Sequence, residues 1–275
     1  MRILRPAPKR AQCIPDFRDE REPADSRRIV RSTDGLDTPP LGRIVTFRHG
    51  GIERPVVTRG GLHLRFKMAS IKTGMTEVGE GRGEELLAMQ CEIDGSVLNF
   101  KCHPYRFEIA FGGAAFTYRP DIAILHRDGR IEIVEVKRTP DDIDEDEREK
   151  LGRVREFVRR CGWEFSIRYL EEIRGSDERE HNVARFFGRR ANKVQREERV
   201  IAEAERAKNV PIRWDRLAGL VSPYDALHGD AVVERLVAGG MFFVDLDSKM
   251  GPASVLTPTT PTTQQPLPGF EEDEA

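Results

Sequence analysis

The sequence has 275 residues, of which 38% are hydrophobic and 33% charged, enough for one large domain or two of ordinary size. Its formal net charge is −2, so the total charge gives no sign of a nucleic-acid-binding protein. No run approaches the roughly 18 apolar residues of a membrane helix, and no apolar signal segment follows the N-terminal charges. We therefore expect a protein that neither spans a membrane nor is secreted. The near-zero total charge is the sum of basic and acidic segments that are unevenly distributed along the chain.

The first 41 residues predict a basic, flexible arm. Residues 1–10 contain four bases (Arg2, Arg5, Lys9 and Arg10) and no acid, and a stretch rich in Pro, Arg and Asp follows. Such a composition buries too little apolar surface to fold alone. We interpret residues 1–41 as a solvated arm or as an arm that orders on nucleic acid.

Residues 42–174 predict a mixed α/β domain. The patterns indicate β-rich pieces over 44–47 and 55–58, a helix over 83–93, strands over 98–109, 118–125 and 131–136, a helix that starts among acids at 141–147 and ends at Gly162, and a strand over 163–170. A hairpin followed by a helix and a further strand is typical of a mixed sheet covered by helices.

Two carboxylates and a lysine carry the chemistry of this domain. Asp121 follows Arg119-Pro120, and thirteen residues separate it from Glu135-Val136-Lys137. Carboxylates are the hard ligands that Mg²⁺ prefers, and a lysine beside them can orient an attacking water, as a phosphodiester hydrolase requires. The two-residue period of a strand places Glu135 and Lys137 on one face. The alternative is an exposed, salt-bridged hairpin, but apolar residues flank all three side chains.

The hairpin between these strands decides whether Asp121 joins the other two. A two-residue loop at Asp128-Gly129 would pair Asp121 with Val136 and turn it to the wrong face. A three-residue loop at 127–129, with Gly129 in a left-handed conformation, pairs Asp121 with Glu135. We therefore predict the three-residue loop, with a divalent ion between carboxylates that would otherwise repel each other.

The cysteines and histidines do not predict a metal site on their own. The four cysteines show no CxxC pair and no histidine at zinc-finger spacing, which favours the reduced thiols of a cytosolic protein. The histidines are isolated in the sequence, and we interpret them as structural or exposed. The residues concerned are Cys13, Cys91, Cys102, Cys161, His103, His126 and His181.

Residues 176–257 predict a second, winged-helix-like module, because helices are followed by a hairpin. The spacing predicts a basic helix over 185–199 with six bases against two acids, then helices over 214–221 and 226–237 and a hairpin over 241–257. We predict DNA contacts from this basic helix, with a solvated face as the alternative. The contact residues would be Arg185, Arg189, Arg190, Lys193 and Arg196.

Residues 258–275 are rich in Thr, Pro and Gln and end in four acids, which predicts a disordered acidic tail. Within it, Gln264, Leu267 and Phe270 have a spacing somewhat like that of sliding-clamp-binding peptides. A sliding clamp is therefore a weak candidate partner, and an inert linker is the alternative.

The motif residues resemble those of a known family. Arg119-Pro120-Asp121 with Glu135-Val136-Lys137 resembles the PD-(D/E)xK nuclease superfamily, and the context from 66 to 174 is similar to its TnsA-type transposon endonucleases. The matching features are a Ser/Lys motif at 66–72, a helix from Glu84 that ends in Glu92-Ile93-Asp94, and a strand with His103-Pro104. Arg82-Gly83 departs from the aliphatic-rich stretch usual in that family.

The resemblance implies a restriction-endonuclease-like mixed-sheet core in which Glu84, or its neighbour Glu85, supplies a third carboxylate. Asp121 and Glu135 would be the other metal ligands, with Mg²⁺ or its substitute Mn²⁺, and Lys137 would be the catalytic lysine. It further implies a cytoplasmic, nucleoid-associated bacterial endonuclease that cleaves the 5′ ends of a transposon beside a DDE-type transposase and an AAA+ ATPase regulator. A stand-alone restriction or repair nuclease and a non-catalytic DNA-binding assembly factor remain the alternatives.

Overall fold

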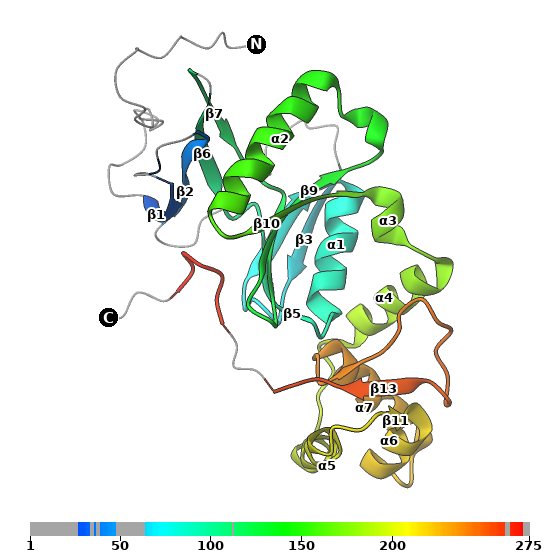
Figure 1. The fold of residues 1–275 in the computed structure, drawn as a ribbon. Helices are drawn as coiled ribbons and strands as arrows, with labels where there is room; N and C mark the ends of the chain where they lie inside the picture. Colours follow the sequence, from blue (N-terminus) through cyan, green and yellow to red (C-terminus); the bar gives the residue numbers. More distant parts are fainter. Residues whose placement is uncertain are drawn as a thin grey trace.

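The fold is described from a computed structural model, which covers residues 27–33, 36, 39–47, 64–111, 113–261 and 265–271 (Figure 1). Two modules follow one another along the chain. We call residues 27–174 the N-terminal module and residues 177–258 the C-terminal module. The β-rich stretch expected at 55–58 lies outside the described residues.

Two four-stranded sheets form the N-terminal module. The first has the order β1-β2-β6-β7 and is antiparallel throughout; its strands are β1 (Arg27–Ser32), β2 (Leu41–Phe47), β6 (Arg106–Phe111) and β7 (Ala114–Tyr118). The second has the order β10-β9-β8-β5 and consists of β5 (Val97–Cys102), β8 (Ile122–His126), β9 (Ile131–Lys137) and β10 (Glu164–Tyr169). Strand β10 is parallel to β9, whereas the other pairs are antiparallel, so the second sheet is mixed.

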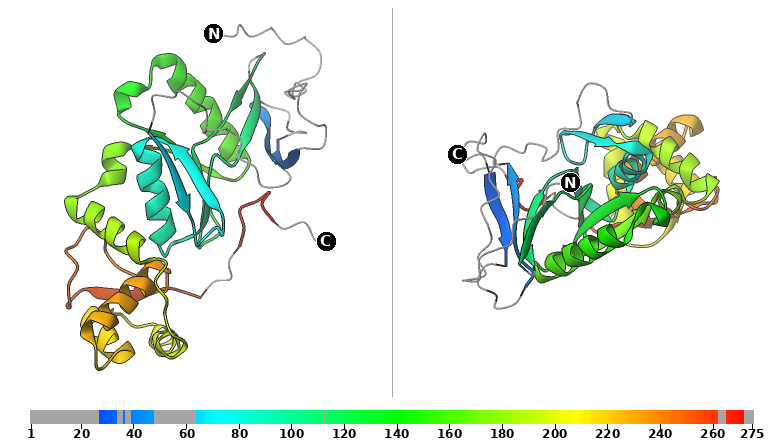
Figure 2. Two further views of the ribbon diagram at one scale, coloured as in Figure 1. Left: turned by 180° about the vertical axis from the view of Figure 1, so that it is seen from behind. Right: turned by 90° about the horizontal axis from the view of Figure 1, so that it is seen from above.

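Helices cover both faces of the second sheet (Figure 2). Helix α1 (Gly81–Ile93) packs on the face that carries Ile122 and Val134. Helix α2 (Glu145–Arg160) packs on the opposite face, against Ala123 and Ile133. This alternation follows from the two-residue side-chain period, and burial on both faces explains why β8 is almost entirely apolar. Four short elements complete the module: the paired strands β3 (Arg65–Ala69) and β4 (Thr76–Glu80), the 3₁₀ helix η1 (Pro140–Asp142) and helix α3 (Leu170–Arg174).

The chain passes from one sheet to the other at two prolines. The sequence predicts single strands over 98–109 and 118–125, but each is two strands that belong to different sheets. The breaks fall at His103-Pro104 and at Pro120-Asp121, between β5 and β6 and between β7 and β8. Proline has no N–H to give to a strand ladder, so a strand interrupted there can leave its sheet. These two breaks place site residues at the junction of the sheets.

The hairpin that joins β8 to β9 has the predicted three-residue loop. Ile122 pairs with Val134 and Leu125 with Ile131, and Gly129 has φ +87°. The same register, extended by one residue, sets Asp121 opposite Glu135. The prediction of the loop is therefore confirmed.

The C-terminal module packs four helices around a small three-stranded sheet of order β11-β13-β12. Its elements are α4 (Asp177–Arg189), α5 (Arg196–Ala207), β11 (Ile212–Arg213), α6 (Trp214–Val221), α7 (Ala226–Ala238), β12 (Phe242–Phe243) and β13 (Val255–Pro258). The predicted single helix over 185–199 is wrong. Helix α4 ends at Arg189, and α5 starts afresh at Arg196, where the Glu198 carboxylate accepts the Gln195 N–H at 2.7 Å.

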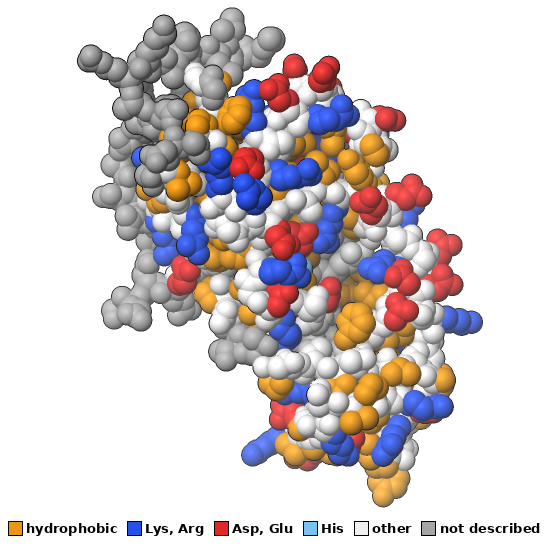
Figure 3. Space-filling view, in the orientation of Figure 1, with side chains coloured by type: hydrophobic (Ala, Val, Ile, Leu, Met, Phe, Trp, Pro, Cys, Tyr) orange, Lys and Arg blue, Asp and Glu red, His pale blue; other side chains and the backbone are white. Residues whose placement is uncertain are grey.

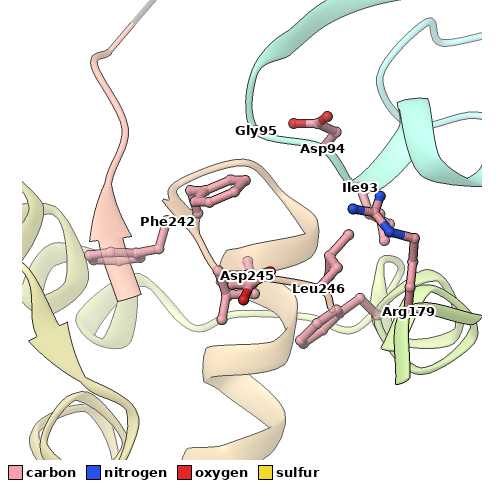
Figure 4. Close-up of a pocket in the computed structure, with 11 residues that line it drawn as sticks. Ile93, Asp94, Gly95, Arg179, Phe242, Asp245 and Leu246 are labelled. Carbon is pink, nitrogen blue, oxygen red and sulfur yellow. The ribbon is translucent and has the colours of Figure 1, made fainter. Parts of the chain in front are cut away.

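The two modules meet at the C-terminal end of α1. Ile93 belongs to the hydrophobic core of the C-terminal module, although it is the last residue of α1. A pocket at this contact is lined by Asp94 and Gly95 beyond α1, by Arg179 of α4 and by the segment from Phe242 to Leu246 (Figure 4). The apolar contact through Ile93 means that α1 connects the core of one module to that of the other.

Both ends of the described chain differ from expectation. Residues 27–32, assigned to the arm, form strand β1 on β2. Leu267, assigned to the disordered tail, is 1% exposed in the core of the N-terminal module, and the Phe270 ring lies 5.9 Å from that of Tyr105. The polar composition of both segments conceals a few apolar side chains that complete this core. No helix among the described residues is long and apolar enough to cross a membrane.

Candidate metal centre

Three separate segments of the N-terminal module bring two carboxylates and an imidazole together. Glu84 comes from the first turn of α1, His103 from the break between β5 and β6, and Asp121 from the residue before β8. One ligand atom from each side chain lies within 4.8 Å of the others, and all three residues are buried. Carboxylate oxygens and imidazole nitrogens are ligands for divalent cations, so this donor set fits a metal ion.

The start of α1 aims Glu84 into this cluster. Its Oε2 accepts the main-chain N–H of Glu80 at 2.9 Å, as an acidic side chain often does at the start of a helix. Gly79 makes room, because a Cβ there would come 2.6 Å from Glu84 Oε2. The neighbouring candidate Glu85 instead pairs with Arg82 at 2.8 Å. The structure thus places Glu84, and not Glu85, beside Asp121.

Asp121 is fixed at the start of β8 with other carboxylates around it. Its Oδ2 accepts the Val136 N–H at 2.7 Å. Burial, followed by the negative charges of Glu135 and Glu84, raises the pKa of Asp121 well above its usual range. A cation among these side chains would offset that repulsion.

Glu135 and Lys137 lie next to the cluster and bind each other. Lys137 Nζ is 2.9 Å from Glu135 Oε1 and 2.7 Å from Glu147 Oε1 of α2. Burial alone would lower the pKa of Lys137, but the hydrogen bonds and charges of Glu147 and Glu135 outweigh it and hold this pKa above its ordinary value. The predicted face shared by Glu135 and Lys137 is present, and the lysine is charged at neutral pH.

Tyr118 is a site residue that sequence reasoning missed. Its hydroxyl donates a hydrogen bond to Glu135 Oε2. Burial, then the charge and hydrogen bond of Glu135, raises the pKa of Tyr118 well above its usual range, so the phenol stays protonated. Its position as the last residue before Arg119-Pro120-Asp121 is the signal that could have indicated it.

His103 is the second missed residue. The sequence predicts a structural or exposed histidine here, because no other ligand is near it along the chain, but the fold brings Glu84 and Asp121 to it. Its Nε2 lies 3.2 Å from Glu84 Oε2, and it is completely buried. The signal was its position directly before Pro104, where a strand can leave its sheet.

The Ser/Lys motif lies at the other end of α1. Ser70 Oγ donates to Glu92 Oε2 at 2.5 Å, and the Ile71 N–H donates to Glu92 Oε1 at 2.8 Å. Lys72 Nζ donates to the carbonyls of Cys91 and Asp94 at 2.7 and 2.8 Å, and burial lowers its pKa to about 8. A cation that binds the last carbonyls of a helix stabilises that end. This motif therefore anchors the helix that carries Glu84.

The predicted DNA-binding bases have different surroundings. Arg185 and Arg189 both pair with the buried carboxylate of Glu234, at 2.6 and 2.9 Å. Arg190 stacks 3.6 Å from the centre of the Phe187 ring, whereas Lys193 and Arg196 are exposed. On the face seen in Figure 3, acidic and basic side chains alternate over the described part of both modules. DNA binding by these residues stays a prediction.

The cysteines of the described residues form no metal site. The thiols of Cys91 and Cys102 are buried and free, and burial raises the pKa of Cys91 to about 12. Cys13 lies outside the described residues. A comparison with protein-family models and a search of curated proteins both found no match. The function is therefore inferred from the geometry of the site.

Proposed function

We propose that this protein is a metal-dependent DNA endonuclease, the subunit of a heteromeric transposase that cleaves the 5′ transposon ends during cut-and-paste transposition. One observation carries the proposal: Glu84 and Asp121 converge in a buried cluster while the Glu135–Lys137 pair lies beside them on the adjoining strand. The hairpin register explains this convergence, because it sets Asp121 opposite Glu135.

Each side chain has a part in phosphodiester hydrolysis. Glu84 and Asp121 would hold the divalent ion, Mg²⁺ or Mn²⁺. When bound, such an ion stabilises the negative charge that develops on a phosphate. Lys137 is protonated at neutral pH and acts as a donor that orients the attacking water, not as a base. Glu135, fixed by Tyr118, keeps the lysine ammonium in place.

The architecture supports a restriction-endonuclease-like core. The mixed sheet β10-β9-β8-β5 has α1 on one face and α2 on the other, and the site lies where β8 begins. The C-terminal helices with their three short strands support a winged-helix-like module. Double-stranded DNA, a DDE-type transposase and an AAA+ ATPase are the partners we propose. The near-neutral total charge supports delivery to DNA by a partner.

The test is a nicking assay on a supercoiled plasmid that carries the transposon ends, with Mg²⁺ or Mn²⁺. The full chain is assayed alone and together with the transposase, if one is encoded beside it. We expect metal-dependent nicking that Asp121→Ala abolishes. The matched control is Asp128→Ala, because Asp128 lies in the exposed turn of the same hairpin and pairs with Arg130.

The alternatives give different results in the same assay. Nicking by the chain alone at sites other than transposon ends would identify a stand-alone restriction or repair nuclease. DNA binding without metal-dependent nicking, with and without the transposase, would identify an assembly factor. Nicking that survives Asp121→Ala would contradict the assignment of the site.

A further inference from the structure

The side chain of His103 is buried at a strained point of the backbone. It lies in the break between β5 and β6 with φ +47°, in the left-handed region that few residues other than glycine adopt. Such conformations are energetically unfavourable and persist where the surrounding structure imposes them. The main chain is held here by the His103 N–H, which donates to the Asp121 carbonyl oxygen at 2.7 Å.

Neither ring nitrogen of His103 has a hydrogen-bond partner among the described residues. Nε2 lies 3.2 Å from Glu84 Oε2, but the two atoms do not make a hydrogen bond. A buried imidazole that bonds to nothing loses its hydration without compensation. Metal-bound histidines commonly lie among carboxylates, so the position of this imidazole beside two carboxylates is typical of a metal ligand.

The distances fit a shared ion. The three ligand atoms lie within 4.8 Å of one another, which is close to the span of one coordination sphere, about 4–5 Å for bonds of 2.0–2.5 Å. One oxygen of Glu84 is fixed by the Glu80 N–H and one oxygen of Asp121 by the Val136 N–H. The second oxygen of each carboxylate can turn to an ion while these bonds persist.

We propose that His103 supplies a nitrogen ligand to the divalent ion held by Glu84 and Asp121, and that this mixed donor set favours a first-row transition ion such as Mn²⁺ over Mg²⁺. The inference deepens the proposed nuclease function and rests on it only for the use of the ion. Imidazole suits transition ions, whereas Mg²⁺ prefers oxygen ligands and retains its water. Glu135 is engaged by Tyr118 and Lys137, so His103 takes the third position that the family resemblance gives to Glu135.

Electron spin-echo modulation of bound Mn²⁺ tests the ligand directly, because a coordinated ¹⁴N nucleus modulates the echo. The full chain is used without a histidine tag. We expect nitrogen modulation in the wild-type protein, its loss in His103→Gln, and its persistence in His126→Gln. His126 is a matched control because its Nε2 lies 2.9 Å from Glu132 on the same sheet, outside the cluster.

Calorimetric titration supplies a second readout. We expect His103→Gln to weaken Mn²⁺ binding at least about 10-fold, as losses in a metal's ligand environment do, and to change Mg²⁺ binding much less. If His103→Gln does not fold, the wild-type spectrum alone decides. Bound Mn²⁺ without nitrogen modulation, or no Mn²⁺ binding by the wild-type protein at 1 mM, would overturn the inference.

Failure of this inference is distinct from failure of the proposed function. Nicking that depends on Asp121, with bound Mn²⁺ that shows no nitrogen modulation, would remove His103 from the ligand set and leave the nuclease standing. Nitrogen modulation in a protein that nicks with neither metal would establish the metal centre and refute the nuclease.

Discussion

The main-chain N–H of His103 donates to the main-chain carbonyl of Asp121 at 2.7 Å, and this bond joins the two points at which the chain changes sheets. The backbone hydrogen bond alone therefore places the side chains of His103 and Asp121 in neighbouring positions. A site built on such a junction is held by both sheets.

The charge of Asp121 is unfavourable for the folded protein when no cation is bound. Burial and the neighbouring carboxylates raise the pKa of Asp121 above its ordinary 3.8, so the folded protein holds this proton more tightly than the unfolded chain does. We expect Asp121→Asn to abolish nicking and to melt about 2–4 °C higher than the wild type in metal-free buffer at pH 7. Differential scanning calorimetry measures this.

The pH dependence of that difference follows from linkage. When the pKa of a carboxyl is higher in the folded protein than in the unfolded chain, the folded protein loses stability as the pH rises. This loss begins near the pKa of the unfolded chain and is complete above the pKa of the folded protein. The advantage of Asp121→Asn should therefore be present at pH 7 and vanish below about pH 4, where the carboxyl is protonated in both states. A variant that is less stable than the wild type at pH 7 and equally so at pH 4 would contradict the repulsion.

Lys137 provides a positive charge that two carboxylates hold in place. Because hydrogen bonds to Glu147 and Glu135 keep it protonated, Lys137→Ala should reduce the nicking rate by about 10²–10⁴-fold. The control is Lys208→Ala, since Lys208 pairs with Glu205 on the surface of the other module. Equal rates for the two variants in single-turnover assays would show that Lys137 has no part in the reaction.

Gly83 allows α1 to approach β9 closely. A Cβ at this position would lie 2.7 Å from Cγ1 of Val136, the residue between Glu135 and Lys137 in β9. We expect Gly83→Ala to cost about 1–3 kcal/mol of unfolding free energy and to reduce nicking by displacing Glu84. Gly152→Ala in α2 meets no atom within 4 Å and should be neutral or gain up to about 1 kcal/mol. Urea denaturation compares the two; a neutral Gly83→Ala would refute the close approach.

Leu267 is part of the core of the N-terminal module although it lies in the polar tail. Because its side chain is 1% exposed, Leu267→Ala should cost about 2–5 kcal/mol of unfolding free energy. Leu227, which is 83% exposed in α7, offers the same substitution with an expected change within about 0.5 kcal/mol. Similar melting temperatures for both variants would mean that the tail is not docked in solution.

The bases predicted to contact DNA should separate into two groups. Arg185→Ala removes one of the two partners of the buried Glu234, so we expect it to destabilise the protein by about 1–3 kcal/mol. Lys193→Ala and Arg196→Ala should leave the melting temperature unchanged. If these two bases contact phosphates, each variant lowers the salt dependence of DNA binding by about 0.9 in the log–log slope. Unchanged slopes in fluorescence titrations would remove them from the DNA interface.

Local patterns predicted much of the fold. Apolar alternation and turn residues located β8, β9, β10, α1 and α2, and counting the loop at 127–129 gave the register of the hairpin. The prolines at 104 and 120 were present in the sequence, but a strand pattern does not say that its second half belongs to another sheet. That information depends on contacts between β6 and β2, which are more than fifty residues apart.

The sequence predicts those residues of the candidate site that lie in one strand or one hairpin. Asp121, Glu135 and Lys137 follow from spacing, and Glu84 was inferred from a resemblance. The sequence does not predict the roles of His103 and Tyr118, because each side chain lies beside a residue of another segment, Asp121 or Glu135. A lone polar residue in a sequence acquires a role only when folding supplies its neighbours.

Residues 265–271 pack on the N-terminal module but are synthesised after the C-terminal module. Tyr105 Oη donates to the Pro268 carbonyl at 2.8 Å, so the last described segment closes a core whose other members were made more than a hundred residues earlier. On the ribosome, the N-terminal module must wait with an open apolar surface until the C-terminal module has been made. A chain cut between the modules would retain Glu84, His103 and Asp121 and still lack Leu267, which completes the core beneath the candidate metal centre.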